Sequence, residues 1–328
     1  MRRSRPVRFA ALIAAAVLLA GCGEEVTEAT KATLVLDFVP NAVHTGIYCA
    51  LDRGYYGAND LELEIVEPTS TSDTLKLIDQ GRAAFGLADA IDVGQQIDRG
   101  LGAKAVMAVV QQPLGGVITL EEAGIRSPRD LGGRTVGVTG VPSDDAVLDA
   151  VVEGDDGNPE AVDTVTIGFN TVPALHSGRV DAITGYPAAD GTALEQRGEE
   201  VRAFPLGEWG GPGYPGLVAF STADAIESDP ELMRAFVDAT VRGYEDTLDN
   251  PDRCLEALVD QVPETDRKLA EAQLDAYLPL FQAPDGRFGA LRPEAFAELS
   301  RFLREGGLAG EEIPPQRFAT DEFVPGGG

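Results

Sequence analysis

The sequence predicts an α/β fold with two lobes and a helical C-terminal tail. Strand-like apolar segments alternate with helix-like segments, a pattern typical of parallel β/α units. This alternation stops near Gln111 and resumes after Ser127, and from about Asp229 onward only helical patterns remain. The chain has 328 residues, 44% of them hydrophobic, and can therefore bury a sizeable core.

The first α/β segment contains four predicted strands, at residues 33–37, 61–67, 83–88 and 103–110. A turn at Pro40 leads into a helix that runs from Asn41 to about Gly54. Residues 69–73 are rich in the hydroxyl and carboxylate side chains that cap helices, and they begin a second helix. A third helix is predicted at residues 90–99.

The second α/β segment repeats this rhythm. Its strands are predicted at residues 135–138, 162–167, 181–184 and 201–205, and its helices at residues 143–152, 173–177 and 190–197. Residues 207–216 are rich in glycine and proline and interrupt the pattern. Four helices then form the tail, at about residues 229–249, 251–262, 265–280 and 293–305.

These breaks predict the domain organisation. Residues 1–21 are expected to be a signal peptide and residues 22–32 a flexible tether. Lobe 1 comprises residues 33–112 and 215–324, lobe 2 with the crossover segments comprises residues 113–214, and residues 325–328 form a disordered tail. Because ligands of open α/β sheets bind beyond the carboxyl ends of strands, we expect the binding site between the lobes.

The N-terminal residues indicate export. Four arginines precede an apolar run at residues 9–20, which is shorter than the roughly 20 residues of a membrane-spanning helix. The run ends in Leu19-Ala20-Gly21-Cys22, which resembles the lipobox of bacterial lipoproteins. This resemblance implies a lipid on Cys22 and an extracytoplasmic protein anchored to the cell membrane. The alternative is a plain secretory signal with an incidental cysteine.

The net charge, the histidines and the cysteines indicate which partners, metal sites and disulfides to expect. The formal net charge of -28 repels nucleic acid, so we expect no nucleic-acid partner. His44 and His176 lie in no metal-ligand cluster, and we expect no metal site. Cys49 and Cys254 either form a disulfide, which an oxidising compartment allows, or remain buried thiols.

Candidate binding residues lie where the first predicted strand gives way to its helix. Asn41, His44 and Tyr48 are spaced i, i+3 and i+7, so they share one helical face. An amide, an imidazole and a phenol on one face suit a polar aromatic ligand. The alternative is that Asn41 caps the helix and Tyr48 packs in the core.

Further candidates follow later strands. Asp89 follows the third strand and is either a cleft residue or a helix cap. Ser143 begins a helix beside Asp144 and Asp145, whose acidic pair the positive end of the helix dipole explains. The hydroxyls of residues 69–72 lie at the start of a predicted helix and could bind the oxygens of an anion, so an anionic ligand is an alternative.

The segment Asp37-Phe38-Val39-Pro40-Asn41-x-x-His44-x-Gly46-x-Tyr48 resembles the thiamine-pyrimidine-precursor family of ThiY-like binding proteins and fungal pyrimidine synthases. The resemblance continues through Gly140-Val-Pro-Ser-Asp144 and through Val180-Asp-Ala-Ile-Thr-Gly-Tyr186-x-x-x-Asp190. Phe38 replaces the usual tryptophan of the family and Asp190 the usual glutamate, so the exact ligand stays open.

The resemblance implies a type 2 periplasmic-binding-protein fold and a substrate-binding lipoprotein that serves an ABC permease. Its ligand would be an aminopyrimidine of the hydroxymethylpyrimidine or formylaminopyrimidine type, bound without a cofactor by a monomer that catalyses no reaction. Phe38 and Tyr186 would sandwich the ring, and Asp190 would accept its amino hydrogen. The alternative for Asp190 is a helix N-cap, and the two roles can coexist. Alternative ligands are riboflavin, another flat heterocycle, or a sulfonate- or nitrate-like anion. A distant alternative is a pyrimidine synthase with His44 as a reactive group.

Overall fold

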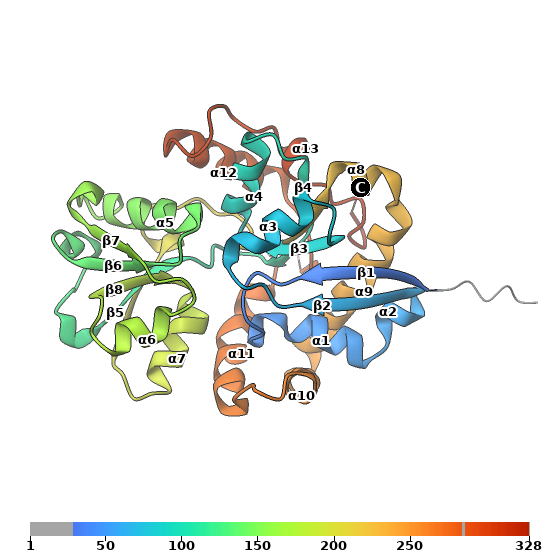
Figure 1. The fold of residues 1–328 in the computed structure, drawn as a ribbon, viewed down its shortest axis with the longest axis horizontal. Coiled ribbons are helices and arrows are strands. Elements are labelled where there is room, and N and C mark those ends of the chain that lie inside the picture. The colour runs from blue at the N-terminus through green and yellow to red at the C-terminus, as the bar shows by residue number, and fades with distance from the viewer. Residues whose placement is uncertain (1–28, 284–285, 328) are drawn as a thin grey trace, which may run out of the picture.

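The computed structural model describes residues 29–283 and 286–327 and contains two five-stranded sheets (Figure 1). The first sheet has the strand order β2-β1-β3-β10-β4. Its strands are β1 (Thr30–Val35), β2 (Leu61–Val66), β3 (Phe85–Ala88), β4 (Ala103–Val110) and β10 (Leu217–Thr222). β1 pairs in parallel with β2 and β3, whereas β10 lies antiparallel between β3 and β4.

The second sheet has the order β7-β6-β8-β5-β9 and repeats this plan. Its strands are β5 (Gly116–Leu120), β6 (Thr135–Val138), β7 (Asp163–Thr166), β8 (Ala182–Gly185) and β9 (Val201–Pro205). β6 is parallel to β7 and β8, and β5 is antiparallel to β8 and β9. We call the first sheet with its helices lobe 1 and the second sheet with its helices lobe 2.

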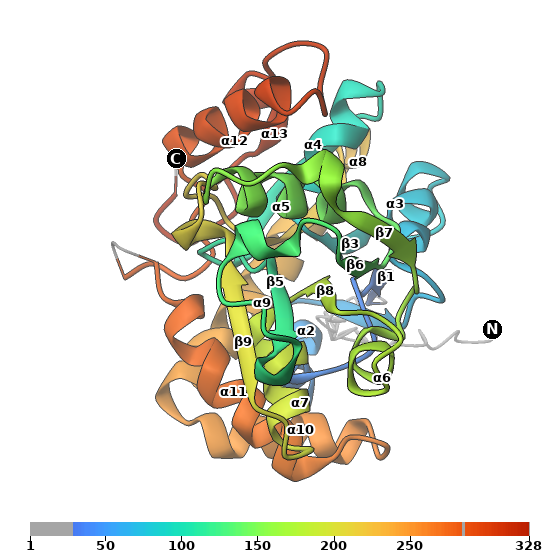
Figure 2. The same ribbon diagram turned by 90° about the vertical axis from the view of Figure 1, so that its left-hand side faces the viewer.

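Helices cover both faces of each sheet. Figures 1 and 2 show α5 on one face of the lobe 2 sheet and α6 and α7 on the other. The helices of lobe 2 are α5 (Pro142–Glu153), α6 (Thr171–His176) and α7 (Thr192–Glu195). Those of lobe 1 are α1 (Thr45–Asp52), α2 (Tyr55–Ala58), α3 (Thr71–Asp79), α4 (Ala90–Asp98), α8 (Ala223–Ser228), α9 (Pro230–Asp249), α10 (Pro251–Gln261), α11 (Arg267–Phe281), α12 (Pro293–Glu305) and α13 (Pro315–Phe318). The predicted α/β fold with a helical C-terminal region is confirmed.

Two strands that we did not predict lie beside the crossovers. β5 begins directly after the first crossover, and β10 directly follows the glycine- and proline-rich second crossover. Each contributes the antiparallel strand of its sheet. No helix in the described part of the chain is long and apolar enough to span a membrane.

The two ends of the folded chain differ from our predictions. Thr30 to Ala32, which we assigned to the tether, pair with Leu61 to Leu63 of β2, so the sheet begins earlier than predicted. Residues 325–327, expected to be disordered, form a turn in which the Gly327 amide donates to the Val324 carbonyl at 2.8 Å. The predicted signal peptide, with Cys22, and Gly328 lie outside the described residues.

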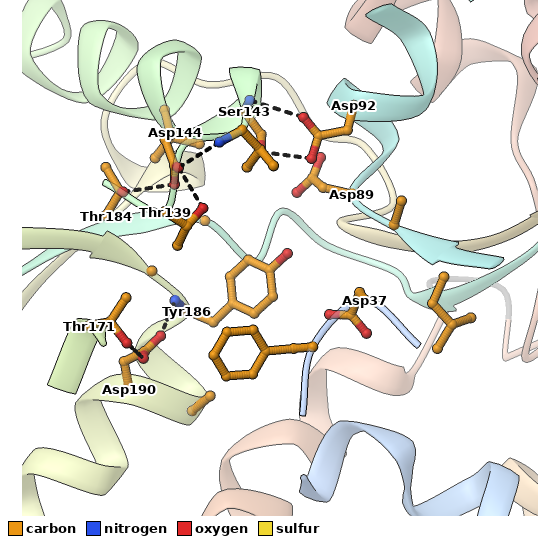
Figure 3. A pocket seen from close by; sticks show the side chains of 18 of the residues that line it. Asp37, Asp89, Asp92, Thr139, Ser143, Asp144, Thr171, Thr184, Tyr186 and Asp190 are labelled. Atoms are coloured by element: carbon orange, nitrogen blue, oxygen red, sulfur yellow. Dashed lines mark hydrogen bonds between the residues drawn. The ribbon is translucent and has the colours of Figure 1, made fainter. Parts of the chain in front are cut away.

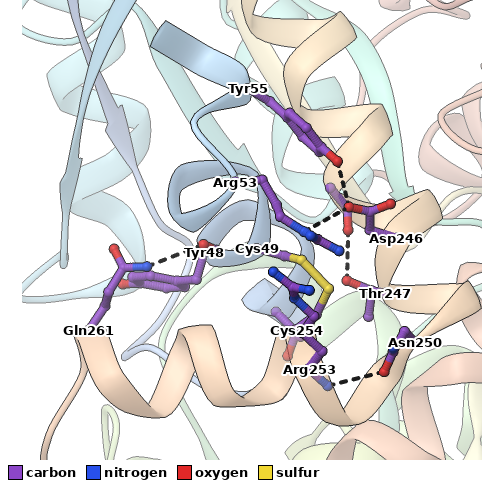
Figure 4. Close-up of a disulfide and its surroundings, with 12 residues drawn as sticks. Tyr48, Cys49, Arg53, Tyr55, Asp246, Thr247, Asn250, Arg253, Cys254 and Gln261 are labelled. Atoms are coloured by element: carbon purple, nitrogen blue, oxygen red, sulfur yellow. Dashed lines mark hydrogen bonds and ion pairs between the residues drawn. A yellow bond between two sulfur atoms is a disulfide. The ribbon is translucent and has the colours of Figure 1, made fainter. Parts of the chain in front are cut away.

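The C-terminal helices complete lobe 1, where α9 and α10 pack against α1, and α12 and α13 pack against α4. At the crossing of α1 and α9, a Cβ on Gly243 would lie 2.1 Å from the Gly46 carbonyl oxygen, so a side chain there would force the helices apart. A disulfide joins Cys49 of α1 to Cys254 of α10 (Figure 4). Beside it, Arg53 pairs with Asp246 of α9 at 3.2 Å. The disulfide and the ion pair thereby link α10 and α9 to the N-terminal segment that contains α1.

Candidate functional site

A cavity lies between the lobes, and we call it the interlobe cavity. Lobe 1 contributes the residues that follow β1 and β3, and lobe 2 those that follow β6 and β8. Because parallel strands present their carboxyl ends at one edge, short turns bring these residues together. The predicted first strand reached Asp37, but β1 ends at Val35, which leaves Asp37 and Phe38 free to face the cavity.

The structure brings six of the eight predicted binding residues to the cavity wall. They are Phe38, Asn41, Asp89, Ser143, Tyr186 and Asp190. His44 and Tyr48 do not line the cavity. The predicted helix begins as a 3-10 turn, η1 (Ala42–His44), and α1 then turns the Tyr48 side chain into the core, where it is 6% exposed.

Asn41 both caps η1 and faces the cavity. Its side-chain oxygen accepts a hydrogen bond from the Val43 amide at 3.0 Å, as the capping alternative predicted. Sequence spacing gave Asn41, His44 and Tyr48 one shared face, but it did not show that most of this face points into lobe 1.

His44 is fully buried and holds Asp37 in place. The Asn41 amide donates to His44 Nδ1 at 3.1 Å, so we assign the ring hydrogen to Nε2. Nε2 then donates to Asp37 Oδ1 at 2.9 Å. His44 therefore contacts the site through Asp37, a residue that our prediction omitted.

Three contacts join the lobes around the cavity. Asp92 of α4 accepts hydrogen bonds from the Ser143 amide at 3.1 Å and the Ser143 hydroxyl at 2.9 Å. The Gln273 side chain of α11 donates to the Ala189 carbonyl at 3.1 Å. The third contact is aromatic: Phe38 of lobe 1 and Phe169 of lobe 2 lie 4.2 Å apart between ring centroids, tilted by 58°.

Asp144 has a structural role. Its Oδ2 accepts hydrogen bonds from the Thr139 hydroxyl at 2.7 Å and from two backbone amides, and its Oδ1 accepts one from the Thr184 hydroxyl at 2.8 Å. These bonds fix the beginning of α5 to the ends of β6 and β8. The structural explanation that we gave for the acidic pair therefore fits Asp144.

Asp190 lies in a π-helical turn, η5 (Pro187–Gly191), and not at the beginning of a regular helix as predicted. Its Oδ1 accepts from the Thr171 hydroxyl at 2.7 Å and its Oδ2 from the Tyr186 amide at 2.9 Å. Tyr186 leads into the same turn, and its ring reaches into the cavity (Figure 3).

The cavity wall is acidic. Its lining includes five aspartates and none of the lysines, arginines or histidines of the described chain: Asp37, Asp89, Asp92, Asp144 and Asp190. Burial raises the pKa of Asp92 to about 7, and burial likewise raises the pKa values of Asp89 and Asp190. Such a wall repels anions and favours ligands that donate hydrogen bonds or carry positive charge.

Sequence reasoning missed Asp37, Asp92 and three threonines of the wall: Thr139, Thr171 and Thr184. Thr139 directly follows a strand, so the strand-end rule that selected Asp89 also applies to it, whereas the prediction placed Asp37 inside the first strand. Asp92 lies in the first turn of α4, one helical turn after Asp89. Nothing in the sequence shows that its partner is Ser143 of the other lobe.

Comparison with solved structures supports the fold. The periplasmic aliphatic sulphonate binding protein SsuA from Escherichia coli superposes with a TM-score of 0.69, at 13% identity, over 88% of this chain and 97% of that one. The likeness confirms a periplasmic-binding-protein fold and, at this identity, says nothing about the ligand.

Sequence comparison identifies closer relatives. The formylaminopyrimidine-binding protein of Halalkalibacterium halodurans is 32% identical over 90% of this chain and 92% of its own length. The riboflavin-binding protein RibY of Chloroflexus aurantiacus is 30% identical over 90% of this chain and 87% of its own length. Residues 41–254 match the NMT1/THI5-like family. The chain is a member of the NMT1/THI5-like family with the fold of periplasmic binding proteins.

Proposed function

We propose that this protein binds a pyrimidine precursor of thiamine between its lobes and delivers it to an ABC permease. The ligand class is an aminopyrimidine with a hydroxymethyl or formylaminomethyl substituent. The observation that carries this proposal is the interlobe cavity itself, where Phe38 of lobe 1 and Tyr186 of lobe 2 accompany the Asp190 carboxylate. The relative from Halalkalibacterium halodurans, whose name specifies formylaminopyrimidine, supports the same ligand class.

An aminopyrimidine matches these groups. A flat ring stacks on aromatic side chains, and each such contact contributes about 0.5–1.5 kcal/mol beyond the burial of area. The exocyclic amine donates to a carboxylate, and a hydrogen bond to a charged group contributes about 1.5–3 kcal/mol. Each oxygen of Asp190 accepts one bond from the protein. Since a carboxylate has about four lone-pair sites, Asp190 retains acceptor capacity for the ligand.

Riboflavin is the second candidate. It too offers a flat heterocycle with hydrogen-bond donors, and the relative from Chloroflexus aurantiacus is named as a riboflavin-binding protein. A sulfonate- or nitrate-like anion fits less well, because the wall of the interlobe cavity carries aspartates and no basic side chain of the described chain. At the beginning of α3, the Thr69 hydroxyl donates to the Asp73 carboxylate.

We propose that the protein binds its ligand and catalyses no reaction on it. In the enzymatic alternative His44 is a reactive group, but His44 is fully buried and its two ring nitrogens are held by Asn41 and Asp37. A ligand in the interlobe cavity contacts Asp37, which lies between the cavity and the imidazole of His44.

Delivery follows from lobe closure. A ligand that contacts both lobes favours the state in which they meet, by as much as its affinity for the two states differs. We propose that the permease recognises this state. We further propose that Cys22 carries a lipid that holds the protein at the outer face of the cell membrane, and that the folded chain acts as a monomer.

The site assignment is tested by Asp190→Ala in a calorimetric titration with hydroxymethylpyrimidine or formylaminopyrimidine, whichever binds the unmodified chain more tightly. We expect an affinity loss of at least tenfold, since a charged hydrogen bond contributes about 1.5–3 kcal/mol. Asp79→Ala is the matched control, because Asp79 is an exposed carboxylate near the end of α3. Equal losses in both variants, or none in either, would remove Asp190 from the site.

A further inference from the structure

A second pocket lies directly beside the interlobe cavity, and we call it the outer pocket. Part of its wall comes from the beginning of α11, where Leu269 and Ala270 line it. Val39, which also lines it, is 37% exposed, so the outer pocket reaches the surface of the protein. The two pockets are neighbours because several residues line both of them: Phe38, Asn41, Thr171, Ala189 and Asp190.

Two phenylalanines form the boundary between the pockets. Phe38 of lobe 1 lines both of them, whereas Phe169 of lobe 2 lines only the outer pocket. The centroids of the two rings lie 4.2 Å apart. The other side chains that the pockets share are smaller than a phenyl ring, and the Thr171 hydroxyl donates to the Asp190 carboxylate at 2.7 Å. The two rings are therefore the bulkiest part of the boundary.

Phe169 reaches the boundary because it follows β7. Since β7 is parallel to β6, the residues after both strands lie at the same edge of the lobe 2 sheet. Gly168, in the turn between β7 and α6, has a φ of +58°, in the left-handed region that favours glycine. Phe169 is half-buried and lies outside the hydrophobic core clusters of the described chain. Replacing it should therefore leave the core of lobe 2 intact.

This boundary limits the size of a ligand. In the proposed function, on which the inference below rests, a pyrimidine ring lies beside Phe38 in the interlobe cavity. A short arm adds little to the length of the ring, whereas a second ring needs the neighbouring space beyond Phe38. When the lobes meet, the Phe169 side chain occupies that space. Steric overlap with a side chain is one way in which a site rejects a larger competitor.

The charge of the outer pocket does not cause such a rejection. Its wall carries the carboxylates of Asp190, Glu264 and Asp266 and the guanidinium of Arg197. Three acidic groups beside one basic group favour a cationic ring, such as the thiazolium of thiamine. Rejection of thiamine would therefore have a steric cause.

We infer that Phe169 sets the size limit of the ligand. With the Phe169 ring in place, the protein accepts a pyrimidine with a short arm and rejects a pyrimidine that carries a second ring. Because the contact between Phe38 and Phe169 joins the lobes, this limit applies in the state that a bound ligand favours. Phe169 is thus a specificity-determining residue of the site.

The test compares hydroxymethylpyrimidine with thiamine, in which an aminopyrimidine ring is joined to a thiazolium ring. In calorimetric titrations of the intact chain, we expect hydroxymethylpyrimidine to bind at least a hundredfold more tightly than thiamine. Phe169→Ala should strengthen thiamine binding at least tenfold. It should weaken hydroxymethylpyrimidine binding only about two- to tenfold, the effect of one lost aromatic contact.

Two further variants control this comparison. Phe169→Leu removes less volume, so it should strengthen thiamine binding at least threefold but less than Phe169→Ala does, and it carries the test if the alanine variant does not fold. Phe302→Ala is the matched control, because Phe302 is a half-buried phenylalanine of α12 that lines neither pocket. It should leave both affinities unchanged.

The outcomes separate this inference from the proposed function. If the unmodified chain binds thiamine as tightly as hydroxymethylpyrimidine, the size limit is overturned and the proposed function stands. The same holds if neither Phe169 variant gains affinity for thiamine, or if Phe302→Ala gains as much as Phe169→Ala. If neither compound binds the unmodified chain or the Phe169 variants, both proposals fail together.

Discussion

Replacing Ser143 by alanine should weaken ligand binding without unfolding the protein. The Ser143 hydroxyl of lobe 2 donates to Asp92 of lobe 1 at 2.9 Å, and this bond exists only while the lobes meet. A hydrogen bond to a charged acceptor contributes about 1.5–3 kcal/mol, and about 1.4 kcal/mol corresponds to a factor of ten. If the ligand binds the state in which the lobes meet, its affinity should fall by about ten- to a hundredfold.

The assay pairs calorimetric titration with small-angle scattering of the free and ligand-saturated protein. Ser143→Ala should weaken binding and leave the free protein more open. Ser177→Ala is the matched control, because the Ser177 hydroxyl donates to the Ala174 carbonyl within lobe 2, at 3.2 Å. An unchanged affinity in Ser143→Ala, with scattering identical to that of the control, would refute the view that this bond stabilises lobe contact.

Two further predictions concern stability. Cys254→Ser should lower the free energy of unfolding by several kcal/mol and leave ligand affinity unchanged. The disulfide to Cys49 spans 205 residues, and the chain-entropy relation gives about 5 kcal/mol for a loop of that size. Denaturant unfolding that matches the unmodified chain would contradict this. The ligand-free protein should also melt at a lower temperature at pH 8 than at pH 5. Burial raises the pKa values of Asp89, Asp92 and Asp190 above those of the unfolded chain, so the folded state binds more protons, and this stabilisation is lost as pH rises toward the pKa of about 7 of Asp92. A melting temperature that rises over this interval would show that these carboxylates are not buried as described.

Much of the fold was predictable because its repeating units leave a local pattern. Parallel strands buried by helices read as short apolar runs, and the helices between them show their caps and apolar faces. β5 and β10 were not predicted because each lies next to a crossover, where glycine and proline residues interrupt the apolar pattern. Their antiparallel pairing also breaks the strand-helix alternation on which the prediction relied.

The site was predictable only where a local rule applied. Residues that follow strands, such as Asp89 and Tyr186, lie at the cavity because the topology places them there. The shared face of Asn41, His44 and Tyr48 was real in spacing, but spacing does not show whether a face points to a cleft or to a core. Contacts between segments far apart in the chain leave no local signal, which is why sequence could not decide between a disulfide and free thiols.

The most direct test of the central claim is a calorimetric titration of the purified chain with hydroxymethylpyrimidine, formylaminopyrimidine, riboflavin and taurine. We predict submicromolar binding of a pyrimidine and no binding of taurine, since the cavity wall in the described chain carries aspartates and no basic side chain. If neither pyrimidine binds and riboflavin or taurine does, the proposed ligand class is contradicted. The fold and its cleft would still stand as described.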